Sequence, residues 1–342
     1  MNANQPGSVA AEPHPRRIVV FCGGVGGARF LHALRSWNHT VSEPAEITAV
    51  VNVADDFTHF GLRVSPDLDS VLYRLAGVSD AAQGWGRAGD TATILDELRQ
   101  WNADGTWFSL GDRDIAMSLL RTQLLDQGLG LTAVTAQLAQ RWPIGLRLLP
   151  ATEHSVQTRV LLEPSPNVPQ ELGFQEWWVR HRAALPARGF RFAGIEQAQA
   201  GPGVCEAIAA ADVLVLAPSN PIVSLDPVLR VPGILPAIRA SSARVLGMSP
   251  VIAGRPVRGY ADRCLDTVGV PATATGIATY FGARSNPGQD AGILDAWLVD
   301  DRDRGQLSEI RTLGLVADSA QILFAGDTTD HSAIQALFRL AT

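Results

Sequence analysis

The chain has 342 residues, of which 46% are hydrophobic, and its formal net charge is −6 at pH 7. It is therefore long and apolar enough to bury a sizeable core. The acidic balance, with no basic run interleaved with aromatic residues, argues against a nucleic-acid partner. No run of about eighteen apolar residues occurs, which argues against a membrane span.

Lysine is absent: all 28 residues in the combined count of lysine and arginine are arginine. The chain therefore has no Walker A lysine, no protein-kinase lysine and no Schiff-base lysine. These absences exclude P-loop nucleotide hydrolases, protein kinases and pyridoxal-phosphate enzymes. If the protein handles phosphate, the groups that do so are arginine, backbone N–H groups or a metal ion.

The first residues and the cysteines indicate the cellular compartment. Residues 1–16 contain no apolar run, so we expect a disordered leader rather than a signal peptide. Cys22, Cys205 and Cys264 are odd in number and far apart, which predicts neither a disulfide framework nor a CxxC zinc site. The sequence therefore predicts a reducing, cytoplasmic location.

Strand-like and helix-like segments alternate from the first strand onward. Residues 17–22 form an apolar, β-branched strand that runs into a glycine turn and an amphipathic helix. A second strand covers residues 46–54, and Ser65-Pro66 begin a helix that Gly77 ends. Further helices are predicted in DTATILDELRQW, DIAMSLLRTQLLDQG and TAVTAQLAQRW, and strands in GLRLLPAT and VQTRVLLEP.

The same alternation resumes in the last third of the chain, with a helix in CEAIAAA and a buried strand in DVLVLAPSN. This pattern predicts an α/β, Rossmann-like, doubly wound fold with a mostly parallel sheet and helices on both faces. No composition shift separates two domains. We therefore expect one domain over residues 17–342, with residues 155–200 as a middle insertion.

The first candidate site is the glycine turn GGVGGARF, which follows the first strand. Its glycines, Gly23, Gly24, Gly26 and Gly27, allow a phosphate to approach the positive end of the following helix, where Arg29 can add a guanidinium group. Arg29 stands in place of the third glycine of GxGxxG, which disfavours a nicotinamide cofactor. The alternative interpretation is a tight turn that binds nothing.

The second candidate is a cluster of four aspartates. Asp55 and Asp56 end the second strand, where open α/β sheets bind ligands, and Asp67 and Asp69 begin the next helix. Asp67 has a simple alternative role, because negative charge complements a helix start. Carboxylates that converge without histidine favour Mg²⁺ over zinc. A solvated acidic loop is the alternative for the cluster as a whole.

Two further segments are candidates for phosphate or nucleotide contacts. Arg113, in FSLGDRD, follows Asp112, a possible N-cap, and could hold a phosphate near a helix start. Ser219 and Asn220 follow a buried strand and precede Pro221, which turns the chain. The alternatives are a capped surface helix for the first segment and an ordinary Ser-Asn-Pro turn for the second.

Seven motifs stand in order along the chain: GGVGGARF, VVNVADD followed by GLRVSPDLDSVLYRLAG, GWG, FSLGDRD, LLPAT, FQEWWVRHR and LAPSNPIVS. Together they resemble the 2-phospholactate transferase family of coenzyme F420 biosynthesis. The form FQEWWVR and the lysine-free composition resemble its bacterial branch, which uses a phosphoenolpyruvate-derived ester and makes dehydro coenzyme F420-0.

The resemblance implies a Mg²⁺-dependent transferase. Such enzymes transfer a phosphoenolpyruvyl or 2-phospholactyl group from a guanosine diphosphate ester to the terminal ribityl hydroxyl of Fo (7,8-didemethyl-8-hydroxy-5-deazariboflavin), and release GMP. By analogy, Asp55 and Asp69 are the metal and catalytic residues, with Asp69 the candidate proton acceptor and Asp56 able to exchange roles with Asp55. The glycine turn and Arg29 or Arg113 would take the phosphates.

The family also implies a homodimer that works with a guanylyltransferase and a glutamate ligase. Two other functions stay open on the sequence alone. One is an NAD(P)-dependent oxidoreductase on the same fold, and the other is a guanine-nucleotide-binding module without catalysis.

Overall fold

The structure is a computed structural model that describes residues 15–80, 82–164, 170–285, 292–324 and 331–341. Most of the predicted leader, residues 1–14, lies outside the described residues.

The centre of the fold is a seven-stranded sheet in which every pair of neighbours is parallel. Its strand order is β14-β13-β10-β9-β1-β2-β5. The bounds of these strands, in chain order, are Arg17–Cys22 (β1), Glu46–Val51 (β2), Arg147–Pro150 (β5), Val213–Leu216 (β9), Arg244–Met248 (β10), Ala296–Asp300 (β13) and Val316–Ala320 (β14). The predicted doubly wound α/β fold is thereby confirmed.

The direction of winding reverses between β1 and β9. From β1 the chain adds β2 and β5 on one side, and then returns to add β9, β10, β13 and β14 on the other. In such sheets a crevice opens at the carboxyl ends of the strands where the order reverses. The glycine turn follows β1, and Ser219 follows β9, so both lie at this switch point.

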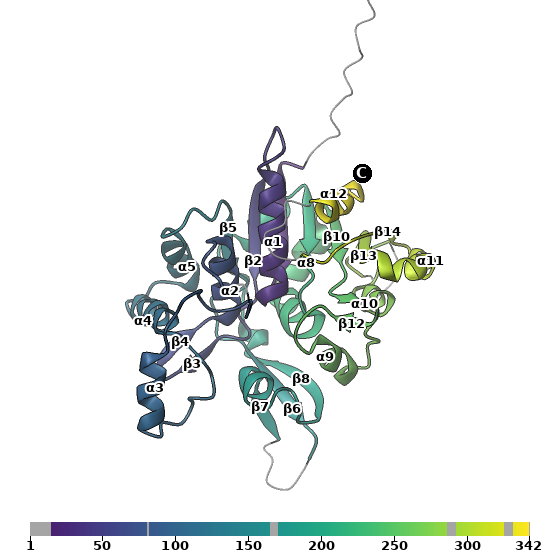
Figure 1. The fold of residues 1–342 in the computed structure, drawn as a ribbon. Helices are drawn as coiled ribbons and strands as arrows, with labels where there is room; N and C mark the ends of the chain where they lie inside the picture. Colours follow the sequence, from purple (N-terminus) through teal and green to yellow (C-terminus); the bar gives the residue numbers. More distant parts are fainter. Residues whose placement is uncertain (1–14, 81, 165–169, 286–291, 325–330, 342) are drawn as a thin grey trace, which may run out of the picture.

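The strands alternate their side chains between two cores, as the pleat of a strand requires. In β1, Val19 and Phe21 belong to one core, whereas Ile18, Val20 and Cys22 belong to the other. Both faces are therefore covered by helices, which Figure 1 shows with α1 in front of the sheet. The core that contains Ile18 is closed by α1 (Gly24–Asn38), α2 (Pro66–Leu75), α4 (Asp112–Asp126), α5 (Leu131–Ala139) and α12 (Ser332–Arg339). The opposite core is closed by α6 (Val204–Ala210), α7 (Asp226–Arg230), α8 (Ile234–Ala240), α9 (Ala261–Thr267), α10 (Ala274–Phe281) and α11 (Leu307–Thr312).

A smaller sheet lies apart from the main one, at the bottom of Figure 1. Its three antiparallel strands, in the order β7-β6-β8, are Glu171–Gly173, Gln157–Leu162 and Ala187–Ala193. They fall within the range predicted as an insertion. Val160 and Trp177 are buried in the same core as α6 and α8, so this sheet packs onto the main domain.

Short elements complete the description. A hairpin of β3 (Phe57–His59) and β4 (Leu62–Val64) and the helix α3 (Thr93–Gln100) lie beside α4, and β11 (Val251–Ile252) pairs with β12 (Arg255–Pro256). The second strand ends at Val51, so the predicted end at residue 54 was too late: residues 52–56 form a loop and turn.

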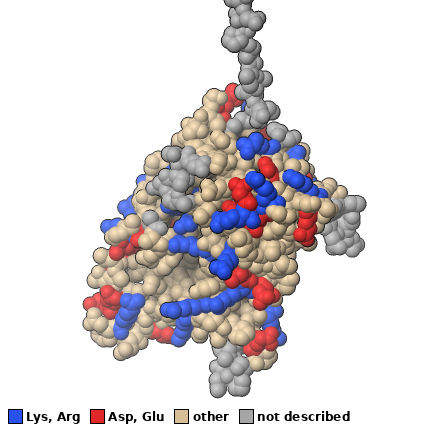
Figure 2. Space-filling model, turned by 45° about the vertical axis from the view of Figure 1, so that its right-hand side comes forward, with Lys and Arg blue, Asp and Glu red and all other residues tan. Residues whose placement is uncertain are grey.

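Two surface properties bear on partners. On the face drawn in Figure 2, arginine side chains are interspersed with acidic ones rather than gathered into an extended basic area. Within the described residues, no single helix is long and apolar enough to cross a membrane, and the pair Pro221–Arg230 and Ile234–Ala240 reaches that length only together, with a bend of 81°.

Candidate functional site

A cavity of about 700 Å³ opens at the switch point of the sheet. Its walls include the glycine turn after β1, the loop after β2, the start of α2 and the loop after β9. Eight of the residues predicted from the sequence line it: Gly23, Gly24, Gly26, Arg29, Asp55, Asp69, Ser219 and Asn220. The structure thus brings most of the predicted site together in one place.

The glycine turn packs so closely against neighbouring segments that several of its positions have no room for a side chain. The helix α1 begins at Gly24, whose φ is +42°, directly after the extended Gly23. A Cβ on Gly26 would lie 2.4 Å from the carbonyl oxygen of Pro218, so α1 approaches the loop after β9 too closely for a side chain. Gly27 lies on the packing side, where a Cβ would lie 2.6 Å from the Cβ of Cys22.

Ser219 fastens the two loops of the switch point to each other. Its hydroxyl accepts a hydrogen bond from the N–H of Gly23 (3.1 Å) and donates one to the carbonyl of the same residue (2.9 Å). The Asn220 Oδ1 accepts from the N–H of Ile222 at 3.0 Å and begins the turn that follows. Both side chains therefore shape the cavity floor.

Arg113 is not brought to this cavity. It lies on the exposed side of α4 and lines a second hollow, together with Arg87, Arg141 and Trp142. Its Nη1 donates to the carbonyl of Ala88 at 3.3 Å. The sequence correctly indicated a helix start here, but the first turn of α4 directs Asp114 toward the cavity and Arg113 away from it.

Asp112 also differs from its predicted role. It is the first residue of α4, and Gly111 is the N-cap. The Asp112 carboxylate accepts instead from the N–H groups of Thr93 (3.2 Å) and Ile94 (3.0 Å), at the start of α3. It therefore caps the neighbouring helix.

Asp55 and Asp67 are the adjacent buried carboxylates of the cavity. Asp67 accepts a hydrogen bond from Asn52 Nδ2 at 2.9 Å and another from the N–H of Gly24. Burial raises the pKa of Asp67 to about 6. Burial also raises the pKa of Asp55 well above its usual range, and the neighbouring Asp67 charge raises it further. The Asp55 Oδ1 atom is buried without a hydrogen-bond partner.

Asp67 was not identified from the sequence as a residue of the site. It does lie in the first turn of α2, as expected for a residue that complements a helix start. Its side chain, however, is buried against the glycine turn: a Cβ on Gly23 would lie 2.5 Å from an Asp67 oxygen. The pair Gly23-Gly24 is the one signal in the sequence that could have found it, because glycines without side chains let another group approach the backbone closely.

Asp69 lines the cavity but is already paired with a buried cation. Arg121, on α4, donates to both of its carboxylate oxygens, with Nη1 at 3.2 Å from Oδ2 and Nη2 in closer contact with Oδ1. Burial raises the pKa of Asp69, although the Arg121 charge opposes this. Asp56 lies just behind, outside the cavity lining, and accepts from the Ser65 hydroxyl at 2.7 Å.

Two arginines face the cavity near the glycine turn. The guanidinium of Arg29 has no hydrogen-bond or ion-pair partner within the part of the chain that the structure describes. Burial lowers its pKa, and the positive charges of Arg258 and Arg74 lower it further. Arg258 was not predicted as a site residue. Its guanidinium donates to the carbonyl of Gln83, which is 175 positions away in the sequence, and to the carbonyl of Ala82 at 2.9 Å. An anion bound between Arg29 and Arg258 would relieve this repulsion.

Aromatic side chains contribute to the wall of the cavity. Trp85, Phe108, Phe174 and Trp178 line it. Trp85 is 47% exposed, which is unusual for so large an apolar side chain. Trp178 is fixed by an edge-to-face contact with Tyr260, with ring centroids 5.1 Å apart. The cavity can therefore accommodate a flat, conjugated ring as well as charged groups.

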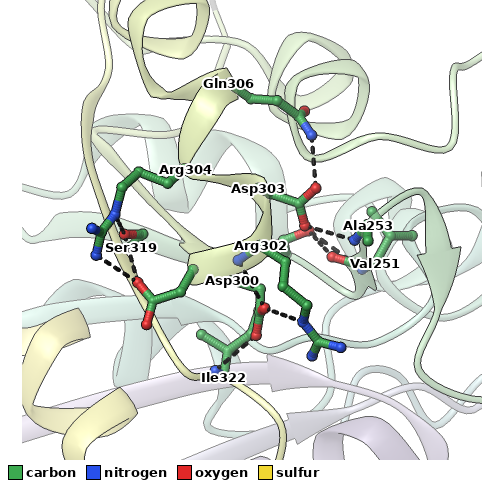
Figure 3. A network of polar contacts seen from close by, with 11 residues as sticks. Val251, Ala253, Asp300, Arg302, Asp303, Arg304, Gln306, Ser319 and Ile322 are labelled. Carbon is green, nitrogen blue, oxygen red and sulfur yellow. Dashed lines mark hydrogen bonds and ion pairs between the residues drawn. The ribbon is translucent and has the colours of Figure 1, made fainter.

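One wall of the cavity is held by the polar network of Figure 3. Asp300, at the end of β13, accepts from the N–H of Ile322 (3.3 Å), which lines the cavity, and from Arg302 Nε (2.7 Å). Asp303 accepts from the N–H of Ala253 (2.9 Å) and from Gln306 Nε2 (2.8 Å). These bonds tie the turn after β13 to the β11–β12 hairpin and keep that wall in place.

Fold and cavity together define a Rossmann-like α/β protein whose ligand site combines buried carboxylates, arginines and aromatic side chains. The model of the family described as 2-phospho-L-lactate transferase CofD matches residues 18–321, so the chain belongs to that family and is a transferase. This confirms the resemblance seen in the sequence, and it disfavours the oxidoreductase and the non-catalytic module.

Similar proteins carry a related name. The chain is 44% identical to a phosphoenolpyruvate transferase of Mycolicibacterium smegmatis over 301 residues, which cover 86% of this chain and 91% of that one. It is 46% identical to the phosphoenolpyruvate transferase of Thermobifida fusca over 291 residues, or 84% and 87% of the two chains. A solved structure of a UPF0052 family protein from Bacillus halodurans shares the fold, with a TM-score of 0.61, 19% identity and coverage of 96% and 100%.

Proposed function

We propose that this protein transfers a phosphoenolpyruvyl group from a guanosine diphosphate ester to the terminal ribityl hydroxyl of Fo. The hydroxyl oxygen would form a bond to the phosphorus that carries the enolpyruvyl group, the anhydride bond would break, and GMP would leave. The observation that carries the proposal is a single cavity at the switch point that is lined by buried carboxylates, two arginines and several aromatic side chains. The names of the relatives favour the phosphoenolpyruvyl group over the 2-phospholactyl group.

The carboxylates fit a Mg²⁺ ion. Asp55 Oδ1 is buried without a partner, and Asp67 lies beside it, so two hard oxygen ligands are available at one point. Among the described residues, no group of three or more His, Cys, Asp or Glu side chains could hold a metal. Mg²⁺ commonly takes one or two carboxylates and completes its shell with phosphate oxygens and water. Here it would neutralise the phosphate charge that develops during transfer.

This assignment modifies the expectation that Asp55 and Asp69 bind the metal. Asp69 is held by Arg121 through both oxygens, and the pair Asp55 and Asp67 is the one without a cation. Asp69 would instead accept the proton of the ribityl hydroxyl. A carboxylate has about four lone-pair sites, so a fork from arginine leaves two for a substrate.

The diphosphate would lie between the glycine turn and the two arginines. The N–H groups of Val25 and Gly26, in the first turn of α1, have no acceptor within the helix, and the N-terminus of a helix favours anions. Arg29 and Arg258 both line the cavity, lie close enough for their charges to repel each other, and supply positive charge. Such preorganised donors stabilise charge in the transition state without reorganisation. The deazaflavin ring would stack against Trp85 or Trp178, which both line the cavity.

The direct test is mass spectrometry of the product. The purified protein would be incubated with Fo, Mg²⁺, GTP, a guanylyltransferase that supplies the ester, and phosphoenolpyruvate, 2-phospholactate or 3-phosphoglycerate in turn. We expect dehydro coenzyme F420-0 with phosphoenolpyruvate, and less product with the other acids. A reaction without Mg²⁺ is the control for the metal. No product with any acid would contradict the proposed function.

A further inference from the structure

Arg121 is an arginine buried in the interior of the protein. It lies on α4, and its side chain is only 3% exposed. Burying a guanidinium is costly unless its charge is paired and its N–H groups are bonded. The charge is paired with Asp69, and Asp56 also lies close enough to raise the pKa of Arg121 against the effect of burial, which lowers it.

The guanidinium is fixed in orientation by three parts of the chain. Nη1 donates to Asp69 Oδ2 (3.2 Å), on α2, and to the carbonyl of Arg63 (3.2 Å), on β4. The hydroxyl of Thr122, the next residue of α4, accepts from the N–H of Arg63 at 2.7 Å. The planar fork is therefore held by β4 and α4, and it holds the carboxylate of Asp69 in turn.

Arg121 cannot itself reach a substrate. It does not line the cavity, whereas Asp69 does, with 14% of its side chain exposed. Any effect of Arg121 on the reaction must therefore pass through Asp69. The fork occupies one side of the carboxylate and leaves lone pairs on the other side for a ligand.

We propose that Arg121 is a positioning residue that orients Asp69 toward the substrate hydroxyl. This inference rests on the proposed function, because it concerns the reaction of that same cavity. If stability alone had selected this pair, apolar residues of similar volume would serve as well or better. Lysine could supply the charge, but as a point charge on a flexible stem it could not hold both oxygens in a fixed plane.

The test is a double-mutant cycle on Asp69 and Arg121, with kcat, KM for Fo and the urea midpoint measured for each variant. In Arg121→Lys we expect kcat to fall by about 10-fold or more with KM within about two-fold, because orientation is needed in the transition state. In Arg121→Met we expect a similar or larger fall in kcat and a lower urea midpoint, because the Asp69 charge is left unpaired.

The double variant Asp69→Asn/Arg121→Met separates positioning from stability. It has no buried charge in the pair, so its urea midpoint should exceed that of Arg121→Met. Its kcat should equal that of Asp69→Asn alone, because Arg121 has no effect once Asp69 has lost its role. A further fall in kcat in the Asp69→Asn background would overturn the proposal. So would Arg121→Lys with the parental kcat, which would make the pair only structural.

The exposed ion pair Asp96–Arg99 on α3 is a matched control, with N–O contact at 2.7 Å. The cycle Asp96→Asn and Arg99→Met should leave kcat and the urea midpoint near the parental values. Crystal structures of the parent and Arg121→Lys provide a readout that needs no turnover. We expect the Asp69 carboxylate to rotate in the variant, and an unchanged orientation would contradict the proposal. Lack of product with the parent protein would instead contradict the proposed function.

Discussion

Substitution of Asp67 by asparagine should make the metal-free protein more stable at high pH while making the enzyme slower. The folded protein raises the pKa of Asp67 from 3.8 to about 6, so folding favours the protonated acid. Stability therefore declines as pH rises from about 4 to about 6, and it stays at the lower level above that range. At pH 8 the ionised carboxylate costs on the order of 3 kcal/mol, which asparagine would remove.

The substitution has an opposing cost. The carboxylate accepts from Asn52 Nδ2 and from the N–H of Gly24, whereas asparagine has a single oxygen for these two donors. One buried donor then loses its partner, which costs about 1–3 kcal/mol at every pH. At pH 8 the free energy of unfolding of the variant should therefore equal that of the parent or exceed it by up to about 2 kcal/mol. The difference in free energy of unfolding, variant minus parent, should increase by about 1 kcal/mol from pH 5 to pH 8.

The assay is urea unfolding in EDTA at both pH values, combined with kcat at pH 8 in Mg²⁺. If Asp67 binds the metal, kcat should fall by about 100-fold, or about 2.7 kcal/mol in barrier. If Asp67 only complements the start of α2, asparagine should cost about 0.3–1 kcal/mol of stability and leave kcat unchanged. A parental kcat, or a stability difference that is equal at pH 5 and pH 8, would refute the reasoning.

Four other outcomes follow from the same geometry. Asp69→Asn should lower the free energy of unfolding by about 3 kcal/mol, because Arg121 is left as an unpaired buried charge; equal stability of variant and parent in urea would contradict this. Mg²⁺ affinity, measured by calorimetry, should fall as pH drops below about 6, since the metal must displace protons; an affinity independent of pH would exclude Asp67 as a ligand. Arg29→Ala should weaken GDP binding by about 10-fold or more and leave Fo binding nearly unchanged, and an unchanged GDP affinity would remove Arg29 from the phosphate site. In the native protein, a thiol reagent at pH 8 should modify the half-buried Cys205 slowly and leave the other two cysteines intact, as peptide mapping would check.

Much of the fold was predictable because its signals are local. Apolar strands that alternate with helices specify a parallel sheet, and a glycine turn between the first strand and helix specifies where a crevice opens. Contact between Gly23 and Ser219 could be inferred in outline, since both follow strands that end at the same edge of the sheet. The strand topology therefore predicts which loops lie close together, because segments that follow parallel strands meet at the same edge of the sheet.

The missed parts of the site depend on partners that are distant in the sequence. Arg121 is 52 positions from Asp69, and Arg258 is 175 positions from the carbonyl that it reaches. No periodicity links such residues. The direction of a side chain is also hidden: Arg113 and Asp114 are neighbours in the sequence, yet only Asp114 lines the cavity. The spacing in the sequence identified the cluster of aspartates, but it did not show that Asp69 is already paired with an arginine.

The electrostatics of the cluster explain why so much negative charge stands at this loop. Asp55, Asp56, Asp67 and Asp69 are largely buried, and burial raises the pKa of each, that of Asp56 to about 7. Of these four aspartates, Arg121 forms hydrogen bonds with Asp69 alone. At the other three positions the burial of an ionised carboxylate carries a free-energy cost, which the Mg²⁺ ion proposed above would reduce. If Asp55 and Asp67 hold that ion, the unfavourable empty state would make its binding tighter. The same charge explains why stability and activity should change in opposite directions at Asp67.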